Sequence, residues 1–407
     1  MTSAEAARAD AAPLLSAAAV RERSRNILAA AESGRTRHFR VDRARIDDAA
    51  ALVERVTRRR YPSLAIPYHS RWRHFEAGGR DRNAELTRAL AGRDAAACAR
   101  TRIDLAVISV LLDAGAGAAW RYDEAESGQR FARSEGLGVA SFRAFMAGAF
   151  SAESRDSLRV DAAALARVDT EKLARAFQVG ERNPLVGLDG RAALLRRLGT
   201  ALREQRATFG DLARPGALYD ALTRDGPTVT ADALLRALLA GLGGIWLARN
   251  ALGGVALGDA WPHPNAGGEG VTAGWVPFHK LSQWLTYSLF EPFEWAGVNI
   301  TGKDALTGLP EYRNGGLLLD TGVLVLVDPN ATRATHDVGS ELVVEWRALT
   351  VGLLDDVAAR VRERLGTPEL PLACILEGGT WAAGRELAGT LRGGEPPLVI
   401  RSDGTVF

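Results

Sequence analysis

Apolar positions recur at helical spacing along most of the chain, and this pattern decides the expected fold class. In the alanine-rich residues 2–33, Leu14, Val20 and Ile27 follow a roughly helical period, which predicts one or two helices. The period continues from Ala152 to Ala240, where only short turn signals rich in proline and glycine interrupt it. The first part of the chain therefore predicts helices of about 10–16 residues, without internal repeats or strand–helix alternation.

Two other segments predict helices of different character. Residues 101–113 (TRIDLAVISVLLD) are apolar nearly all round, which indicates a buried helix. Burial makes Asp104 and Asp113 costly unless each carboxylate is paired. After Ser340, the apolar spacing predicts one long amphipathic helix that continues to Leu365.

After Tyr312 the spacing of apolar residues changes, and short apolar runs predict some β structure. Val323 to Val327 is β-like, and residues 370–376 and 398–405 are short strand candidates. We therefore expect a mainly α fold, a large multi-helix domain with a small β element near the C-terminus. Residues 1–45 are expected to form an N-terminal helical arm, and residues 46–407 a single helical domain that holds the site.

Composition narrows the functional classes. The 407 residues are 47% hydrophobic and 25% charged, as in an ordinary globular protein. A net charge of +2 provides no field for nucleic acid, and no apolar run reaches the roughly 18 residues of a membrane span. The two cysteines lie far apart, so we expect no disulfide framework and a cytoplasmic protein without nucleic-acid or membrane partners.

The common catalytic and cofactor signatures are absent from the sequence. There is no GxSxG elbow, HExxH helix, paired CxxC or dinucleotide fingerprint, so no cofactor is expected. The glycine-rich GLGGIW at residues 241–246 lacks the spacing of a phosphate loop. The six histidines are widely spread, so a metal site would have to be assembled from distant segments, and none is expected.

The stretch from Trp261 to Arg347 concentrates the residues that could do chemistry. Nine of the chain's 27 aromatic residues lie between Trp261 and Tyr312, and two of its three lysines, Lys280 and Lys303, lie there as well. Several carboxylates stand beside these rings. In a ring-lined pocket, a carboxylate suits glycoside cleavage, because it stabilises an oxocarbenium-like transition state and activates water.

Three carboxylates of this stretch are the catalytic candidates: Glu311, Asp320 and Glu345. Glu311 adjoins Tyr312 and Arg313, which offer a ring wall and a cation. For each carboxylate a buried salt bridge is the competing interpretation. Glu345 and Arg347 are two apart on one predicted helix and cannot share a face, so we expect one to point into the site and the other to brace it.

The expected substrate-binding residues combine forked donors with aromatic walls. They are His69, Arg71, Arg73, Trp120, Tyr122, His279, Lys280, Trp284, Tyr312, Arg313 and Arg347. Arginines and histidines between aromatic rings suit a phosphate, a carboxylate or a ureido group. An arginine network that braces the fold is the alternative for the cluster at residues 69–74.

Several long motifs, in order along residues 35–400, resemble the uracil-catabolism protein family of fungi and bacteria, long described as a domain of unknown function. They are IPYHSRWRHF (66–75), DAGAGAAW (113–120), RSEGL (133–137), NPLVGLDGR (183–191), FHKLSQWL (278–285) and LTGLPEYRNGGL (306–317). The resemblance implies a route in which uracil is ribosylated and its ring opened, leaving urea attached to ribose. A step that splits the urea–ribose bond is then required, and this family is the candidate.

A second resemblance covers about residues 303–385. The segments LPEYR (309–313), GVL (322–324) and EWRA (345–348) are similar to Ala-Asp-Tyr-Arg and Glu-Ile-Arg-Ala segments of the queuosine-salvage nucleosidases. That family implies a helical fold like that of DNA glycosylases and an aspartate that cleaves an N-glycosidic bond. Glu311 stands where that aspartate stands, one methylene longer.

Three hypotheses follow. The first is an N-glycosidase that cleaves ribosylurea, or its phosphate, to urea and ribose, or ribose phosphate. The second is a non-catalytic protein of the same pathway that binds an intermediate or acts as a scaffold. The third is a metal-dependent amidohydrolase that acts on the ureido group. A closed, ring-lined pocket with converging carboxylates favours an enzyme over a scaffold.

Overall fold

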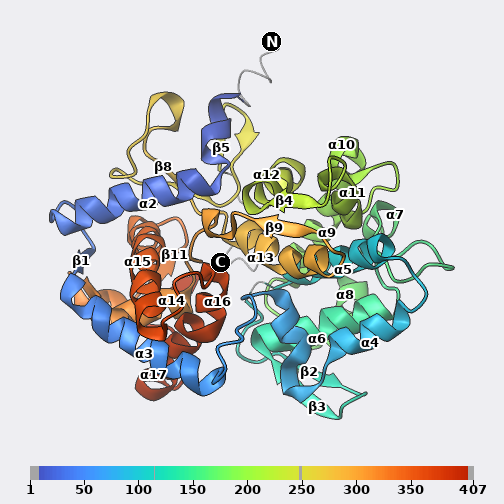
Figure 1. Cartoon of the computed structure of the whole chain (residues 1–407), viewed down its shortest axis with the longest axis horizontal. Helices are drawn as coiled ribbons and strands as arrows, with labels where there is room; N and C mark the ends of the chain where they lie inside the picture. Colours follow the sequence, from blue (N-terminus) through green and yellow to red (C-terminus); the bar gives the residue numbers. More distant parts are fainter. Residues whose placement is uncertain (1–8, 114, 247–249, 402–407) are drawn as a thin grey trace. The chain divides into compact units, whose positions relative to one another are not determined.

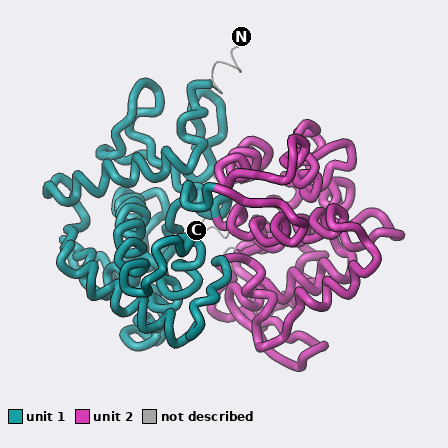
Figure 2. Tube along the Cα trace, viewed as in Figure 1, with its two compact units in different colours: residues 1–69, 250–283, 302–401 teal, residues 70–249, 284–301, 402–407 magenta. Residues whose placement is uncertain are grey.

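The computed structural model describes residues 9–113, 115–246 and 250–401 and divides the chain into two compact units (Figure 2). Unit 1 comprises Met1–His69, Asn250–Gln283 and Gly302–Arg401, and unit 2 comprises Ser70–Arg249, Trp284–Thr301 and Ser402–Phe407. Both units are therefore discontinuous in sequence. The expected division into an arm before residue 46 and one domain after it stays a prediction.

Unit 1 is built around α15 (Glu341–Leu365), the long helix that the sequence predicts. α15 packs against α2 (Ala17–Glu32) and α3 (Ile46–Arg60), and α14 (Tyr312–Asp320) packs against α17 (Trp381–Arg392) (Figure 1). α15 is buried on nearly all sides along its first half, since residues 342–354 are all buried. This explains why its polar residues need partners within the unit.

The other elements of unit 1 are short. The helical turns are η1 (Ala12–Leu14), η2 (Arg43–Arg45), η6 (Gly270–Thr272), η7 (Lys303–Ala305), η8 (Pro329–Arg333), α16 (Leu372–Ile375) and the π-helical turn η9 (Leu376–Thr380). The antiparallel strand pairs are β1 (Phe39–Val41) with β10 (Leu324–Leu326), β5 (Ala251–Leu252) with β6 (Val255–Ala256), and β7 (Ala260–Pro262) with β8 (Trp275–Pro277). β11 (Thr335–Asp337) pairs in parallel with β12 (Val399–Arg401).

Unit 2 contains the predicted buried helix, α5 (Ala95–Leu111). Both acidic residues of the predicted segment 101–113 are paired. Asp104 is fully buried; it accepts hydrogen bonds from the Arg214 guanidinium and from the backbone N–H groups of Val160 and Gly216. Asp113, just past the helix, lies 3.2 Å from a guanidinium nitrogen of Arg71. The expectation that burial would force these carboxylates into pairs is confirmed.

The remaining elements of unit 2 are mostly helices, with two short strand pairs. The helical elements are η3 (Arg71–Gly79), α4 (Arg82–Ala89), α6 (Arg133–Met146), α7 (Ala162–Leu165), α8 (Thr170–Ala176), α9 (Leu188–Glu204), α10 (Arg206–Phe209), η4 (Pro215–Ala217), α11 (Leu218–Leu222), α12 (Ala231–Leu242) and η5 (Gly243–Ile245). β2 (Arg121–Glu124) pairs with β3 (Gln129–Ala132), and β4 (Thr228–Thr230) pairs in parallel with β9 (Asn299–Thr301). Helix α13 (Lys280–Glu294) starts in unit 1 and ends in unit 2.

The expectation of a mainly α fold is confirmed, and one predicted strand is wrong. Of the predicted strand 398–405, Val399–Arg401 form β12 and residues 402–405 lie outside the described residues. Residues 370–376 instead contain α16, which begins after Pro371, and the start of η9. The expected similarity to the queuosine nucleosidases stays a prediction. Across the described residues, every helix is too short or too polar to cross a membrane.

Candidate functional site

In unit 1, the side-chain amide of Gln283 joins the motif FHKLSQWL to the motif LTGLPEYRNGGL. Its Oε1 accepts the backbone N–H of Thr307 at 2.9 Å, and its Nε2 donates to the Thr307 hydroxyl at 2.8 Å. Both residues are fully buried. The first turn of α13, which carries Lys280, is thereby fixed to the loop that leads to Glu311.

A buried ion pair makes the second connection between these motifs. Arg347 on α15 binds both carboxylate oxygens of Asp259 at 2.7 Å, and its Nε donates to the carbonyl of Pro310 at 3.4 Å. Asp259 in turn accepts the backbone N–H of Lys280 at 3.0 Å. Although burial opposes it, Arg347 lowers the pKa of Asp259 to about 2. Arg347 therefore braces the site from within the core.

His279 has a strained backbone next to this pair. Its φ is 48°, in the left-handed region that a residue with a Cβ rarely adopts. The imidazole is buried, its Nε2 lies 2.9 Å from the carbonyl of Leu14, and burial lowers its pKa. His279 thus anchors the chain at the start of α13 with a neutral ring, and the strained residue orients the helix that begins at Lys280.

Glu311 begins α14 as its N-cap. Its carboxylate accepts the backbone N–H of Arg313 at 2.8 Å and of Asn314 at 2.6 Å. Burial raises the pKa of Glu311, while those two bonds and the nearby charges of Lys280 and His69 act in the opposite direction. Glutamate is not among the preferred N-cap residues, which are short polar side chains. The position thus combines a helix cap with a desolvated carboxylate beside a lysine and a histidine.

His69, whose charge acts on Glu311, is paired with a second carboxylate that the sequence analysis missed. Nδ1 of His69 lies 3.0 Å from the carboxylate of Glu377, which also accepts from the guanidinium of Arg60 at 2.9 Å and the hydroxyl of Tyr61 at 3.1 Å. Despite burial, His69 and Arg60 lower the pKa of Glu377. Glu377 lies in the π-helical turn η9, a type of distortion that often accompanies functional sites.

The other two catalytic candidates have partners outside this group. Asp320 ends α14, about 13 Å along the helix axis from Glu311, and binds both guanidinium nitrogens of Arg392 at 2.7 and 2.8 Å. Glu345 is fully buried in α15 and accepts the backbone N–H of Phe39 at 2.8 Å. The structure does not bring Asp320 together with Glu311, and it engages Glu345 with the segment before β1.

The remaining candidates of unit 1 flank Glu311. The guanidinium of Arg313 stacks on the ring of Tyr312 at 4.7 Å and donates to the carbonyl of Gly394 at 3.2 Å. Arg313 therefore attaches α14 to the end of α17. Tyr312 is half-buried at the start of the same helix.

Five of the expected binding residues belong to unit 2. Arg71 is fully buried and donates from Nε to the hydroxyl of Ser109 at 2.6 Å, with the Trp284 ring 5.6 Å from its guanidinium. Trp120 is buried, donates to the carbonyl of Phe177 at 2.9 Å and lies beside Tyr122. These contacts brace unit 2, and a binding role for these residues stays a prediction.

Arg73, the fifth of these residues, pairs with a carboxyl group whose pKa is unusually high. Its guanidinium lies 2.7 Å from Glu291 of α13, and the hydroxyl of Ser70 donates to the other oxygen of that carboxylate. Burial raises the pKa of Glu291 to about 7, against the opposing charge of Arg73. At neutral pH this carboxyl is therefore partly protonated.

The sequence signals for the missed residues were weak. Gln283 lies inside the motif FHKLSQWL, where its position was visible but its polar role was not. Glu377 directly follows the segment 370–376 that was predicted as a strand, so its neighbours gave no helical register. Asp259 lies two residues before Trp261, outside the stretch that the aromatic count defined.

Known proteins match this sequence over almost the whole chain. A family model described as a protein of unknown function (DUF1688) matches residues 13–407. "Uracil catabolism protein 4" of Lachancea kluyveri is 39% identical over 96% of this chain and 98% of its own length. "Protein urg3" of Schizosaccharomyces pombe is also 39% identical, over 97% of this chain and 98% of its own length. The resemblance stated from the motifs is confirmed.

Proposed function

The chain belongs to the family described as a protein of unknown function (DUF1688), and from that premise we propose that it is an N-ribosyl hydrolase of uracil catabolism. The name of the Lachancea relative supports the pathway. The proposed substrate is ribosylurea or its phosphate, and the proposed products are urea and ribose or ribose phosphate. One observation supports the chemistry: within unit 1 the charges of Lys280 and His69 act on the buried carboxyl of Glu311, and His69 is paired with Glu377.

The two carboxylates of this group differ in the direction of their pKa shifts. Burial raises the pKa of Glu311, whereas His69 and Arg60 lower that of Glu377. Opposed shifts on neighbouring carboxyl groups are typical of sites that divide acid and base roles. Glu377 stays ionised and positions the imidazole, while Glu311 has the higher proton affinity that a general base needs.

We assign the steps as follows. The carboxylate of Glu311 faces the anomeric carbon of ribose, stabilises the developing positive charge and accepts a proton from the attacking water. As the water oxygen bonds to that carbon, the bond to the urea nitrogen breaks. His69, held through Nδ1 by Glu377, donates a proton from Nε2 to the leaving urea. Lys280 favours the ionised form of Glu311 in the resting site.

A simple cap is the competing role for Glu311, and a variant series separates the two roles. Glu311→Gln should lower the rate of urea release from ribosylurea by at least about 100-fold, because the amide cannot accept the proton. Loss of one capping interaction alone should cost only about 1 kcal/mol of folding stability. Urea is measured by an enzyme-coupled assay at a temperature where both proteins are folded.

Two further variants serve as controls for that measurement. Glu311→Asp keeps a capping carboxylate and should retain more activity than Glu311→Gln. Glu369→Gln removes an exposed carboxylate of the same unit and should leave the rate unchanged. If Glu311→Gln releases urea at the wild-type rate, Glu311 has no part in the chemistry.

A further inference from the structure

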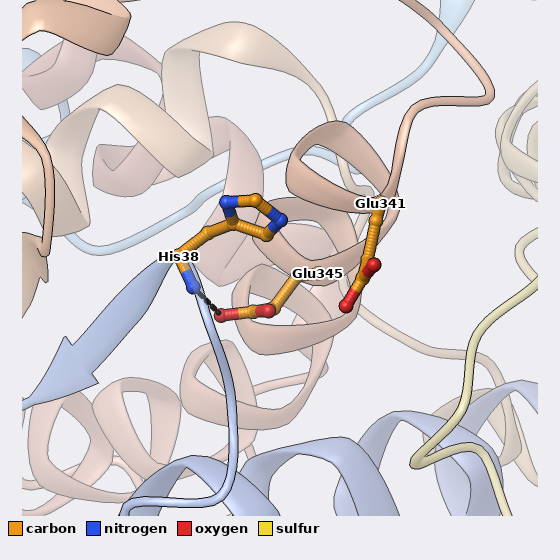
Figure 3. A group of neighbouring side chains, drawn as sticks. All are labelled: His38, Glu341 and Glu345. Carbon is orange, nitrogen blue, oxygen red and sulfur yellow. Dashed lines mark hydrogen bonds between the residues drawn. The ribbon is translucent and has the colours of Figure 1, made fainter.

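One histidine and two glutamates from distant segments of the chain meet in unit 1. His38 precedes β1, and Glu341 and Glu345 lie one turn apart on α15, so both face the same side of that helix (Figure 3). One possible ligand atom from each residue lies within 4.8 Å of the others. His38 and Glu341 are half-buried, so the group is buried on one side and accessible on the other.

The carboxylate of Glu345 is the buried member of this cluster, and its bonding is incomplete. Its Oε1 accepts the backbone N–H groups of Phe39 at 2.8 Å and His38 at 3.3 Å. Its Oε2 is buried and has no hydrogen-bond partner within the described chain. A fully buried carboxylate with an unsatisfied oxygen is costly unless a cation compensates its charge.

No side-chain cation of the described residues fills this role. Arg347, two residues further along α15, is committed to Asp259. Arg37 reaches Glu341, at 3.4 Å, and its side chain is 75% exposed. Among the described residues, the imidazole of His263 lies within salt-bridge distance of Glu345. Its Nε2 is 3.8 Å from Oε2, and this distance is too long for a hydrogen bond.

His263 lies beside Glu345 without a hydrogen bond to it. Its Nδ1 accepts the backbone N–H of Asn265 at 3.2 Å. Its Nε2 is buried, has no hydrogen-bond partner among the described residues, and faces Glu345.

We propose that His38, Glu341 and Glu345 bind one divalent transition-metal ion, for which zinc is the first probe. One imidazole and two carboxylates suit zinc or manganese, and three protein ligands leave a coordination position for water on the accessible side. Zinc ligands lie about 2.1 Å from the ion, so His38 and Glu341 must each close in slightly. The ion would fix the segment before β1 to α15.

The test uses the purified full chain, stripped with a chelator and then titrated with zinc or manganese chloride. We expect close to one ion per chain by elemental analysis and a rise in the melting temperature on binding. His38→Ala and Glu341→Gln change half-buried ligands and leave the buried Glu345 in place. Each should weaken binding at least about 100-fold, beyond the 10- to 100-fold typical for loss of an outer partner.

Two control variants lie elsewhere in unit 1. Glu369→Gln and His336→Ala should bind the metal like the wild type, since neither residue belongs to the cluster. A stripped chain that binds neither zinc nor manganese, or that binds them equally well after His38→Ala and Glu341→Gln, would overturn the proposal. These readouts are metal content and melting temperature, so they do not depend on the proposed hydrolysis.

Discussion

At the scale of single residues, several carboxylates of this protein are buried, and their partners decide how far each pKa shifts. Asp259 has two bonds to a guanidinium and a pKa of about 2, whereas Glu291 has one such contact and a pKa of about 7. The number and geometry of the compensating donors decide whether burial or charge pairing dominates. The sequence alone could not predict the different pKa values of Asp259 and Glu291, because their partners lie tens of residues away or more along the chain.

The raised pKa of Glu291 predicts a pH dependence of folding stability. Between about pH 4.5 and 7 the folded chain holds a proton on Glu291 that the unfolded chain has released, so this group makes stability fall as the pH rises. The loss is on the order of 3 kcal/mol across that window. Chemical denaturation of wild type and Glu291→Gln at several pH values measures it.

In this experiment Glu291→Gln should be less sensitive to pH than the wild type, because the amide does not titrate. Glu204→Gln, an exposed change in the same unit, should keep the wild-type dependence. Equal pH dependence of Glu291→Gln and the wild type would show that the carboxyl of Glu291 is ionised across the window.

At the scale of elements, the position of Glu311 depends on the close packing of α14 against α17. A Cβ built at Gly384 of α17 would lie 2.0 Å from the carbonyl oxygen of Arg313, which forms part of the first turn of α14. Gly384→Ala should therefore push the helices apart, destabilise the protein by at least about 1–3 kcal/mol and lower the activity assigned to Glu311.

The same helix provides the matched control for this prediction. Gly389 is exposed on α17, and an added Cβ there meets no atom within 4 Å. Gly389→Ala should stabilise the helix by about 0.5–1 kcal/mol and leave activity unchanged. Thermal unfolding and urea release compare the two variants, and equal effects at both positions would refute the packing argument.

Helical periodicity predicted the elements with long apolar patterns. The bounds of α15 and the buried character of α5 followed from spacing alone, and the pairing of Asp104 followed from the cost of burial. Residues 370–376 were misread because a short apolar run fits a strand or a buried helical turn equally well. The π-helical turn that carries Glu377 has no signature in a single sequence.

The candidate site was predicted only in part, for a related reason. Glu311 was selected by its aromatic and basic neighbours in sequence, and Lys280 by the rarity of lysine. The partners that give these residues their setting, Glu377 and Asp259, come from segments that only the tertiary structure brings near. Local patterns identify side chains of the right chemistry, but the pairing of distant segments decides which of them act together.

At the scale of the whole molecule, the chain matches the two fungal relatives named above over nearly its full length. Along the sequence, segments of unit 1 and unit 2 alternate. Neither unit is one continuous segment (Figure 2). The residues proposed for hydrolysis come from all three segments of unit 1, including His69, Lys280 and Glu311. The proposed reaction therefore requires the chain from the first segment to the last.

The most direct test of this account is the identity of the product that carries the urea carbon. Ribosylurea labelled with ¹³C at the ureido carbon is incubated with the purified protein and followed by ¹³C NMR. Cleavage of the N-glycosidic bond should move the label into free urea, and Glu311→Gln should slow that change by at least about 100-fold. Label that appears as bicarbonate or carbamate, or that stays in unchanged substrate, would contradict the account.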